Sequence, residues 1–164
     1  MSIRVATAEC FTHGKVAEEV HAFSRGYPGN YTWRLSPEKY GLSLVAGLFI
    51  PTLSGVRTIL RIDPLPVITS IDDIKVYDQD GDLAMALIMA EAVKSITGSE
   101  IGIGTSAGIG KGGVAIVCDA VKIINKTEIS ADLRSSLPSE ILARQKSGID
   151  IALLCLEKCL SDFY

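Results

Sequence analysis

Residues 3–14, Ile-Arg-Val-Ala-Thr-Ala-Glu-Cys-Phe-Thr-His-Gly, decide the fold of this chain. The run Ile3–Thr7 predicts a short strand, and the apolar spacing after it predicts a helix over Thr12–Ser24, with Thr12 as the N-cap. Cys10 falls between the strand and the helix. Backbone N–H groups and the positive end of a helix dipole favour a thiolate at such a position. Cys10 is therefore a candidate nucleophile.

Outside this stretch, the spacing of apolar residues predicts alternating helices and strands. We expect a mobile or substrate-facing loop at 25–41 and a three-layer α/β/α fold with a central mixed sheet. An acidic first turn, rather than a calcium loop, explains the aspartates that precede the helix at 82–97. The expected strands are Leu44–Pro51, Val56–Ile62, Ile74–Val76, Ile101–Ile103, Val114–Cys118 and Val121–Ile124. The expected helices are Asp82–Thr97, ended by Gly98, and Pro138–Leu160, interrupted at Gly148.

Composition limits the classes of partner. The chain has 164 residues and a net charge of −3, which fits a single domain over 1–164 and gives no basic tract for nucleic acid. The longest apolar runs, such as Leu42–Leu53, contain Gly, Ser and Pro and are too short for a membrane span. The four cysteines show no Cys-x-x-Cys pair, so we expect reduced thiols in the cytoplasm and no metal site.

The second candidate ligand segment is the glycine-rich stretch 102–113. It fails as a serine-hydrolase elbow because no histidine follows it, and its match to a dinucleotide fingerprint lacks the following helix. Small residues let backbone amides approach a ligand, and Lys111 can neutralise an anion. The alternative is a turn built for tight packing. We predict ligand contacts from this segment, which shares one end of the sheet with Cys10. The residues are Thr105, Ser106, Gly108, Gly110 and Lys111.

The four cysteines differ in their neighbours. Cys118, Cys155 and Cys159 stand among apolar residues, which predicts core positions. Cys10 stands among polar residues, and His13 nearby is a base for the thiol, an anion donor or a surface residue. The predicted ligand contacts around Cys10 are Glu9, Thr12, His13 and Gly14. We expect Cys10 to accept an acyl group, with an oxyanion site formed by N–H groups at the helix start.

The stretch Ala8-Glu9-Cys10-Phe11-Thr12-His13-Gly14 resembles the Ala-Glu-Ser-Cys-Thr-Gly-Gly signature of the CinA C-terminal family of nicotinamide mononucleotide deamidases. The serine nucleophile of that family falls on Cys10. The segment Ala107-Gly108-Ile109-Gly110 is similar to the Ala-Gly-Pro-Gly loop of the same family. The resemblance implies a CinA-like fold, but it puts Arg57 where that family has a lysine. Arginine stays protonated and is a poor general base, so hydrolysis of an acyl adduct should be slow.

The opening Ala-Thr-Ala-Glu-Cys-Phe-Thr-His-Gly-Lys-Val-Ala resembles more closely the HcgF family of methanogenic archaea. That family takes part in building the guanylylpyridinol cofactor of [Fe]-hydrogenase. The resemblance implies that Cys10 forms a thioester with the carboxyl group of guanylylpyridinol after an ATP-dependent partner enzyme has adenylylated it. It implies a transferase-like acyl acceptor with no permanently bound cofactor, only guanylylpyridinol as a covalently attached ligand. We further expect a homo-oligomer.

Two other functions stay open at this point. The first is a pyridine-nucleotide amidohydrolase, which would release ammonia from nicotinamide mononucleotide with Cys10 in place of serine. The second is a non-catalytic nucleotide-binding protein in which Cys10 has a structural role. The reactivity of Cys10 separates both from the acyl-acceptor hypothesis.

Overall fold

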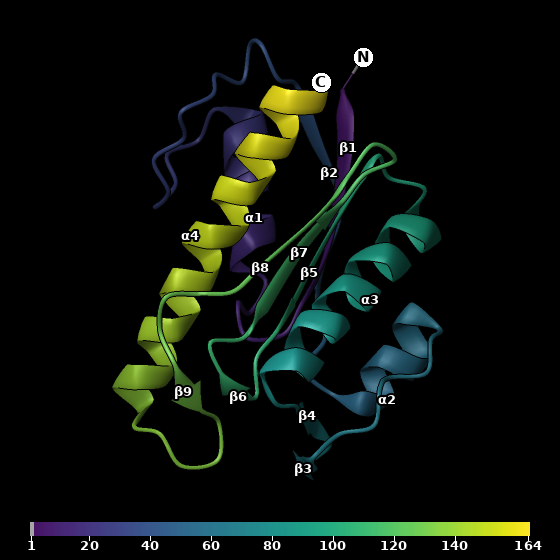
Figure 1. Ribbon diagram of the computed structural model, residues 1–164. Coiled ribbons are helices and arrows are strands. Elements are labelled where there is room, and N and C mark those ends of the chain that lie inside the picture. Colours follow the sequence, from purple (N-terminus) through teal and green to yellow (C-terminus); the bar gives the residue numbers. More distant parts are fainter. Residues whose placement is uncertain (1) are drawn as a thin grey trace.

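A mixed sheet forms the middle layer of the protein (Figure 1), whose computed structural model describes residues 2–164. The sheet has five strands in the order β2-β1-β5-β7-β8. β1 runs parallel to β2 and β5, whereas β5, β7 and β8 are antiparallel neighbours. The strands are β1 (Ile3–Glu9), β2 (Leu42–Phe49), β5 (Ile101–Ser106), β7 (Gly113–Val117) and β8 (Lys122–Asn125). Two short antiparallel pairs lie outside the sheet: β3 (Thr69–Ile71) with β4 (Ile74–Val76), and β6 (Ile109–Gly110) with β9 (Ala131–Asp132).

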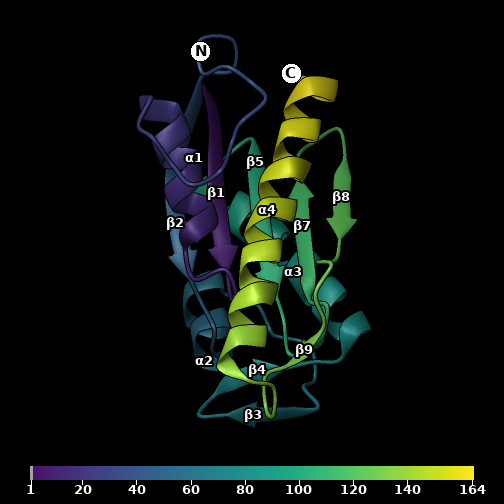
Figure 2. The same cartoon turned by 90° about the vertical axis from the view of Figure 1, so that its left-hand side faces the viewer.

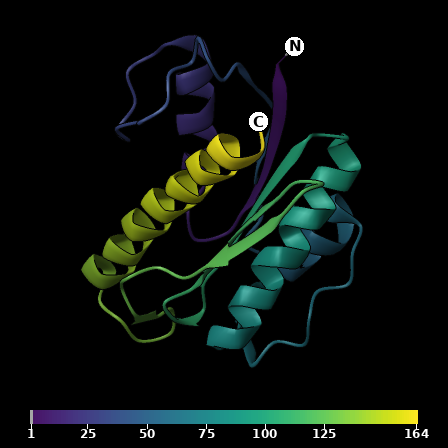
Figure 3. The ribbon, with the colours of Figure 1, turned by 45° about the horizontal axis from the view of Figure 1, so that its top comes forward.

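Helices cover both faces of the sheet. α1 (Lys15–Arg25) and α4 (Pro138–Phe163) lie on one face, and α3 (Gln79–Thr97) lies on the other (Figures 2 and 3). The short helix α2 (Leu53–Gly55) and the π-helical turn η1 (Val56–Leu60) lie on the α3 side. The predicted α/β/α layering with a mixed central sheet is confirmed. Within residues 2–164, none of the helices combines the length and the apolar character that crossing a bilayer requires.

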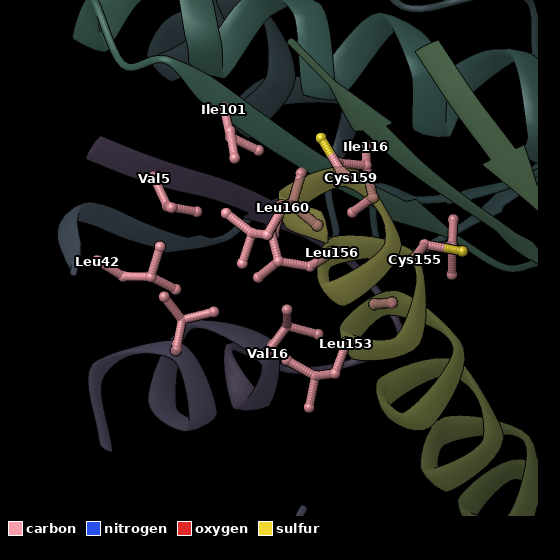
Figure 4. Close-up of a cluster of buried hydrophobic side chains, with 14 of the residues drawn as sticks. Val5, Val16, Leu42, Ile101, Ile116, Leu153, Cys155, Leu156, Cys159 and Leu160 are labelled. Carbon is pink, nitrogen blue, oxygen red and sulfur yellow. The ribbon is translucent and has the colours of Figure 1, made fainter. Parts of the chain in front are cut away.

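The two largest hydrophobic clusters hold the layers together. The larger lies between α1, α4 and the sheet and includes Val5, Val16, Ile116 and Leu156 (Figure 4). The smaller lies under α3, where Met85, Met89 and Val93 pack with residues of η1. Full burial of one such side chain contributes about 1.5–3 kcal/mol. The predicted core positions of Cys118, Cys155 and Cys159 are confirmed, because all three are buried in the larger cluster.

The structure corrects one predicted strand, one predicted helix start and one predicted helix interruption. The expected strand Val56–Ile62 is the turn η1, which buries Val56 and Leu60, four residues apart, on one side. The first helix begins at Lys15 rather than Thr12, because the backbone of His13 and Gly14 is left-handed (φ 54° and 78°). α4 is continuous through Gly148, where a Cβ atom would lie 2.3 Å from the ring of Phe11. The glycine therefore makes room for a side chain of the Cys10 loop.

The glycines of the segment 102–113 bring α3 close to the sheet. A Cβ atom on Gly102 would lie 2.2 Å from the backbone oxygen of Ala90, and one on Gly104 would lie 2.0 Å from that of Ala86. Such distances are not possible without moving the helix. Gly113 on β7 meets the α3 backbone in the same way. These three glycines fulfil the packing alternative rather than a ligand-binding role.

Candidate functional site

Cys10 lies directly after β1, at the end of the sheet toward which β1 and β2 point (Figure 2). Because β1 and β5 are parallel and Ala8 pairs with Gly104, the residues that follow both strands meet. The Cys10 N–H donates to the Thr105 carbonyl oxygen at 3.2 Å and to its hydroxyl at 3.0 Å. The prediction that Cys10 and the glycine-rich segment share one end of the sheet is confirmed.

The Glu9 carboxylate satisfies the start of α1. It is fully buried and accepts bonds from the N–H groups of Val16 (3.2 Å) and Ala17 (2.9 Å). The hydroxyls of Thr7 (2.9 Å) and Thr12 (2.6 Å) also donate to it. An anion at a helix N-terminus is favourable, and here Glu9 supplies it. These two N–H groups are thus occupied and cannot contribute to the oxyanion site expected at the helix start.

The hydrogen bonds of Glu9 also change the roles expected for Glu9 and Thr12, which the sequence predicted as ligand contacts. Glu9 ties β1 to α1 and holds the loop between them. Thr12 is not the N-cap, because Gly14 occupies that position without a side-chain bond. The Thr12 hydroxyl instead joins Glu9 to the hydroxyl of Thr105 at 2.9 Å. The Thr12 and Thr105 side chains are fully buried and support Cys10.

A cavity of about 140 Å³ opens over Cys10. The Cys10 side chain is only 5% exposed, and what is exposed faces a largely apolar space. The rings of His13 and Phe49 lie 4.8 Å apart on this cavity, and Phe49 is 50% exposed, which places an aromatic pair at its mouth. The lining consists of Cys10, Phe11, His13, Phe49, Pro51, Ile74, Ala107, Leu133, Ile141 and Arg144.

His13 is the lining side chain suited to accept a proton. Partial burial and the positive charge of Lys15 lower its pKa, while Glu9 opposes that shift. The neutral imidazole is therefore the main form at neutral pH. The backbone N–H of His13 donates to the Cys10 carbonyl at 3.3 Å. This bond closes the turn that brings both residues to the cavity.

Arg144 is a buried cation in the cavity wall. Its side chain is 1% exposed, and Nη1 donates to three carbonyl oxygens, those of Gly108 (3.1 Å), Gly110 (2.9 Å) and Ala131 (2.6 Å). The Nε atom is buried without a hydrogen-bond partner among the described residues. Burial lowers the pKa of Arg144, and the charges of Asp82, Cys10 and Asp132 raise it. Cys10 and Arg144 are thus electrostatic neighbours in one cavity.

The predicted contacts of the glycine-rich segment do not line the cavity. Ser106 donates its hydroxyl to Asp82 at 2.8 Å, and the Gly108 N–H donates to the same carboxylate at 2.7 Å. The Gly110 carbonyl accepts from Arg144, and the Lys111 N–H donates to Gln79. Asp82 lies in the acidic first turn of α3, as interpreted from the sequence, and its side chain is fully buried. Burial raises its pKa to about 6.

Of the predicted contact residues, the structure brings Cys10 and His13 together in the cavity, and Thr105 directly supports Cys10. Arg57, the candidate equivalent of the amidase lysine, is exposed on η1 and does not line the cavity. Sequence reasoning missed Arg144 and Phe49. A signal for Arg144 was present, because it lies four residues before Gly148 and eight before Ala152 on the buried face of α4.

The other three cysteines do not line this cavity, and Cys155 lines a separate pocket next to β8 and α4. Burial raises the pKa of the Cys155 thiol and raises that of Cys159 to about 12. Cys118 and Cys159 face each other inside the core with their sulfur atoms 3.7 Å apart. In the part of the chain that the structure describes, no group of three or more His, Cys, Asp or Glu side chains is arranged to hold a metal ion.

Comparison with known proteins gives one family and one fold. The family described as "FeGP cofactor biosynthesis protein HcgF" matches residues 2–160. A UPF0254 protein (MTH1148 homolog) of Methanothermobacter thermautotrophicus strain Winter is 59% identical over 162 residues, which are 98% of each chain. A UPF0254 protein of Methanocorpusculum labreanum is 54% identical over 157 residues, 95% of this chain and 91% of that one.

The similar solved structures are competence-damage proteins. One from Klebsiella pneumoniae (ComA) has a TM-score of 0.61 at 14% identity and covers 99% of this chain and 89% of its own. Another from Enterobacter asburiae has a TM-score of 0.62 at 16% identity, covering 97% and 88%. Identities this low show a shared fold, which confirms the predicted CinA-like architecture.

Proposed function

This chain belongs to the HcgF family of FeGP cofactor biosynthesis proteins, and from that membership we propose that Cys10 is the acyl acceptor for guanylylpyridinol. Its thiolate attacks the adenylylated carboxyl group of the pyridinol and forms a protein thioester. The partner that supplies the activated substrate is an ATP-dependent adenylylating enzyme. The observation that carries the proposal is the position of Cys10 beside His13 in a cavity with an aromatic mouth, which none of the other three cysteines lines.

The chemical step needs little from the protein beyond placement. The Cys10 sulfur forms a bond to the acyl carbon, and the bond from that carbon to the phosphate oxygen of AMP breaks. AMP leaves with the electron pair, and the thiol proton passes to the neutral imidazole of His13. Since the adenylate is already a good leaving group, proximity and orientation supply most of the acceleration.

The size of the cavity indicates how the substrate is oriented. At about 140 Å³ it is smaller than the roughly 300–1,000 Å³ of pockets that hold a whole drug-sized ligand. It admits the acyl group and part of the pyridinol ring, so the guanosine lies outside. His13 and Phe49 at the mouth offer faces on which the heteroaromatic ring can stack. Apolar walls from Pro51 and Ile141 exclude water, which favours a persistent thioester.

Intact-protein mass spectrometry tests this proposal. The protein is incubated with guanylylpyridinol, ATP and the adenylylating enzyme. We expect a mass increase equal to guanylylpyridinol minus water, and we expect hydroxylamine to remove it. The Cys10→Ala variant should show no adduct, while the matched Cys155→Ala variant should be modified like the wild type. An adduct on Cys10→Ala would contradict the proposal. Ammonia release from nicotinamide mononucleotide, abolished in Cys10→Ala, would instead indicate the amidohydrolase function.

A further inference from the structure

An acyl transfer to Cys10 needs a group that stabilises the negative oxygen of the tetrahedral intermediate. Preorganised donors for such an oxygen are a large part of catalysis in acyl transfer. The N–H groups of Val16 and Ala17, which a helix start would normally offer, are bound to the Glu9 carboxylate. The Cys10 N–H is bound to Thr105. These three N–H groups are therefore occupied, which directs attention to side-chain donors in the cavity wall.

Arg144 has the unsatisfied donor that the site requires. Its guanidinium is held on one side, because Nη1 donates to the carbonyls of Gly108, Gly110 and Ala131. Its Nε is buried and has no partner among residues 2–164, and the side chain, which is 1% exposed, lines the cavity with Cys10. A buried donor left unpaired is unfavourable, because it has lost its hydrogen bonds to water. An arginine fixed through one nitrogen and unpaired at another is preorganised for an anionic or strongly polarised oxygen.

We propose that Arg144 binds the acyl oxygen of the substrate and stabilises the oxyanion that forms when Cys10 attacks. This inference rests on the proposed acyl-acceptor function and adds the electrophilic residue to it. The guanidinium charge acts in an enclosed apolar cavity, where it is screened less than in water. The same charge gives the cavity a preference for anionic over neutral ligands of equal shape. That preference is measurable without guanylylpyridinol.

Alkylation of Cys10 by two small reagents tests the preference. Iodoacetate is an anion and iodoacetamide is its neutral counterpart, so the ratio of their rate constants at Cys10 reports the local charge. The rates are read from the Cys10 peptide by mass spectrometry. Relative to wild type, Arg144→Gln should lower the iodoacetate-to-iodoacetamide ratio by about tenfold. The control is Arg134→Gln, at an exposed arginine that pairs with Asp132 and does not line the cavity. Its ratio should match that of the wild type.

A purely structural role of Arg144 would loosen the loops it holds and change both rates together, leaving the ratio unchanged, and that result would overturn the inference. A second measurement needs no variant. Nicotinate should protect wild-type Cys10 from iodoacetamide at about one-tenth the concentration that nicotinamide needs. Equal protection by the two compounds would also contradict the proposed role of Arg144. If both anion preferences hold but no thioester forms with adenylylated guanylylpyridinol, the acyl-acceptor function fails while the anion site remains.

Discussion

The loop 10–14 and the segment 102–113 look alike as sequences and differ in the folded protein. The loop follows β1, and the segment runs from within β5 to the start of β7. Both are rich in small or polar residues, and both reach the same end of the sheet. The loop places Cys10 and His13 on a cavity. The glycine-rich segment turns its bare backbone toward α3 instead, where Gly104 leaves no room for a Cβ atom. A glycine cluster therefore marks close approach of backbone, and the approaching partner can be a helix as readily as a ligand.

The largest effect is expected from adding one methyl group to the packing region. In Gly104→Ala the new Cβ would meet the Ala86 backbone oxygen at 2.0 Å, so α3 must move away from β5. We expect the free energy of unfolding to fall by at least about 3 kcal/mol. Urea denaturation followed by circular dichroism measures it.

The matched control is Gly41→Ala, where no atom lies within 4 Å of the new Cβ. That variant should be as stable as the wild type or slightly more so, since alanine lowers the entropy of the unfolded chain. If Gly104→Ala proves equally harmless, the glycine-rich segment is not held by α3, and its role as a ligand loop must be considered again.

A second test uses the pH dependence of the region behind the cavity. Burial raises the pKa of Asp82 from its usual 3.8 to about 6, so the folded state binds the proton more tightly than the unfolded state. The contribution of this group to stability is therefore complete below pH 4 and is lost as the pH rises through 6, a change of about 3 kcal/mol. Between pH 4 and 7, the unfolding free energy of the wild type should fall by this amount relative to that of Asp82→Asn. Parallel curves would show that the Asp82 proton is not linked to folding.

A smaller effect is expected at the Cys10 loop. In Glu9→Gln an NH2 group replaces one carboxylate oxygen. This group cannot accept hydrogen bonds from the N–H groups or hydroxyls that surround it. We expect a loss of about 2 kcal/mol in unfolding free energy. Glu18→Gln, at an exposed position in the first turn of α1, is the control and should lose much less. Equal losses in both variants would mean that Glu9 contributes only its charge.

The sequence predicted the layers and the position of Cys10 better than it predicted the rest of the site. The spacing of apolar residues located α3 and its end at Gly98, and the strand-loop-helix order placed Cys10 at the sheet edge. The cavity wall could not be predicted, because Phe49, Ile74 and Arg144 come from three distant elements whose meeting depends on tertiary packing. Glu9 was misinterpreted for a related reason. A carboxylate beside a nucleophile has the same sequence signature whether it faces a ligand or the helix N-terminus.

A crystal structure of the protein after incubation with guanylylpyridinol, ATP and the adenylylating enzyme tests the central claim most directly. The account predicts continuous electron density from the Cys10 sulfur into the cavity, with the acyl oxygen within hydrogen-bond distance of Arg144 and the guanosine beyond the His13–Phe49 pair. Density for the ligand along residues 102–113, with the Cys10 sulfur unmodified, would contradict it.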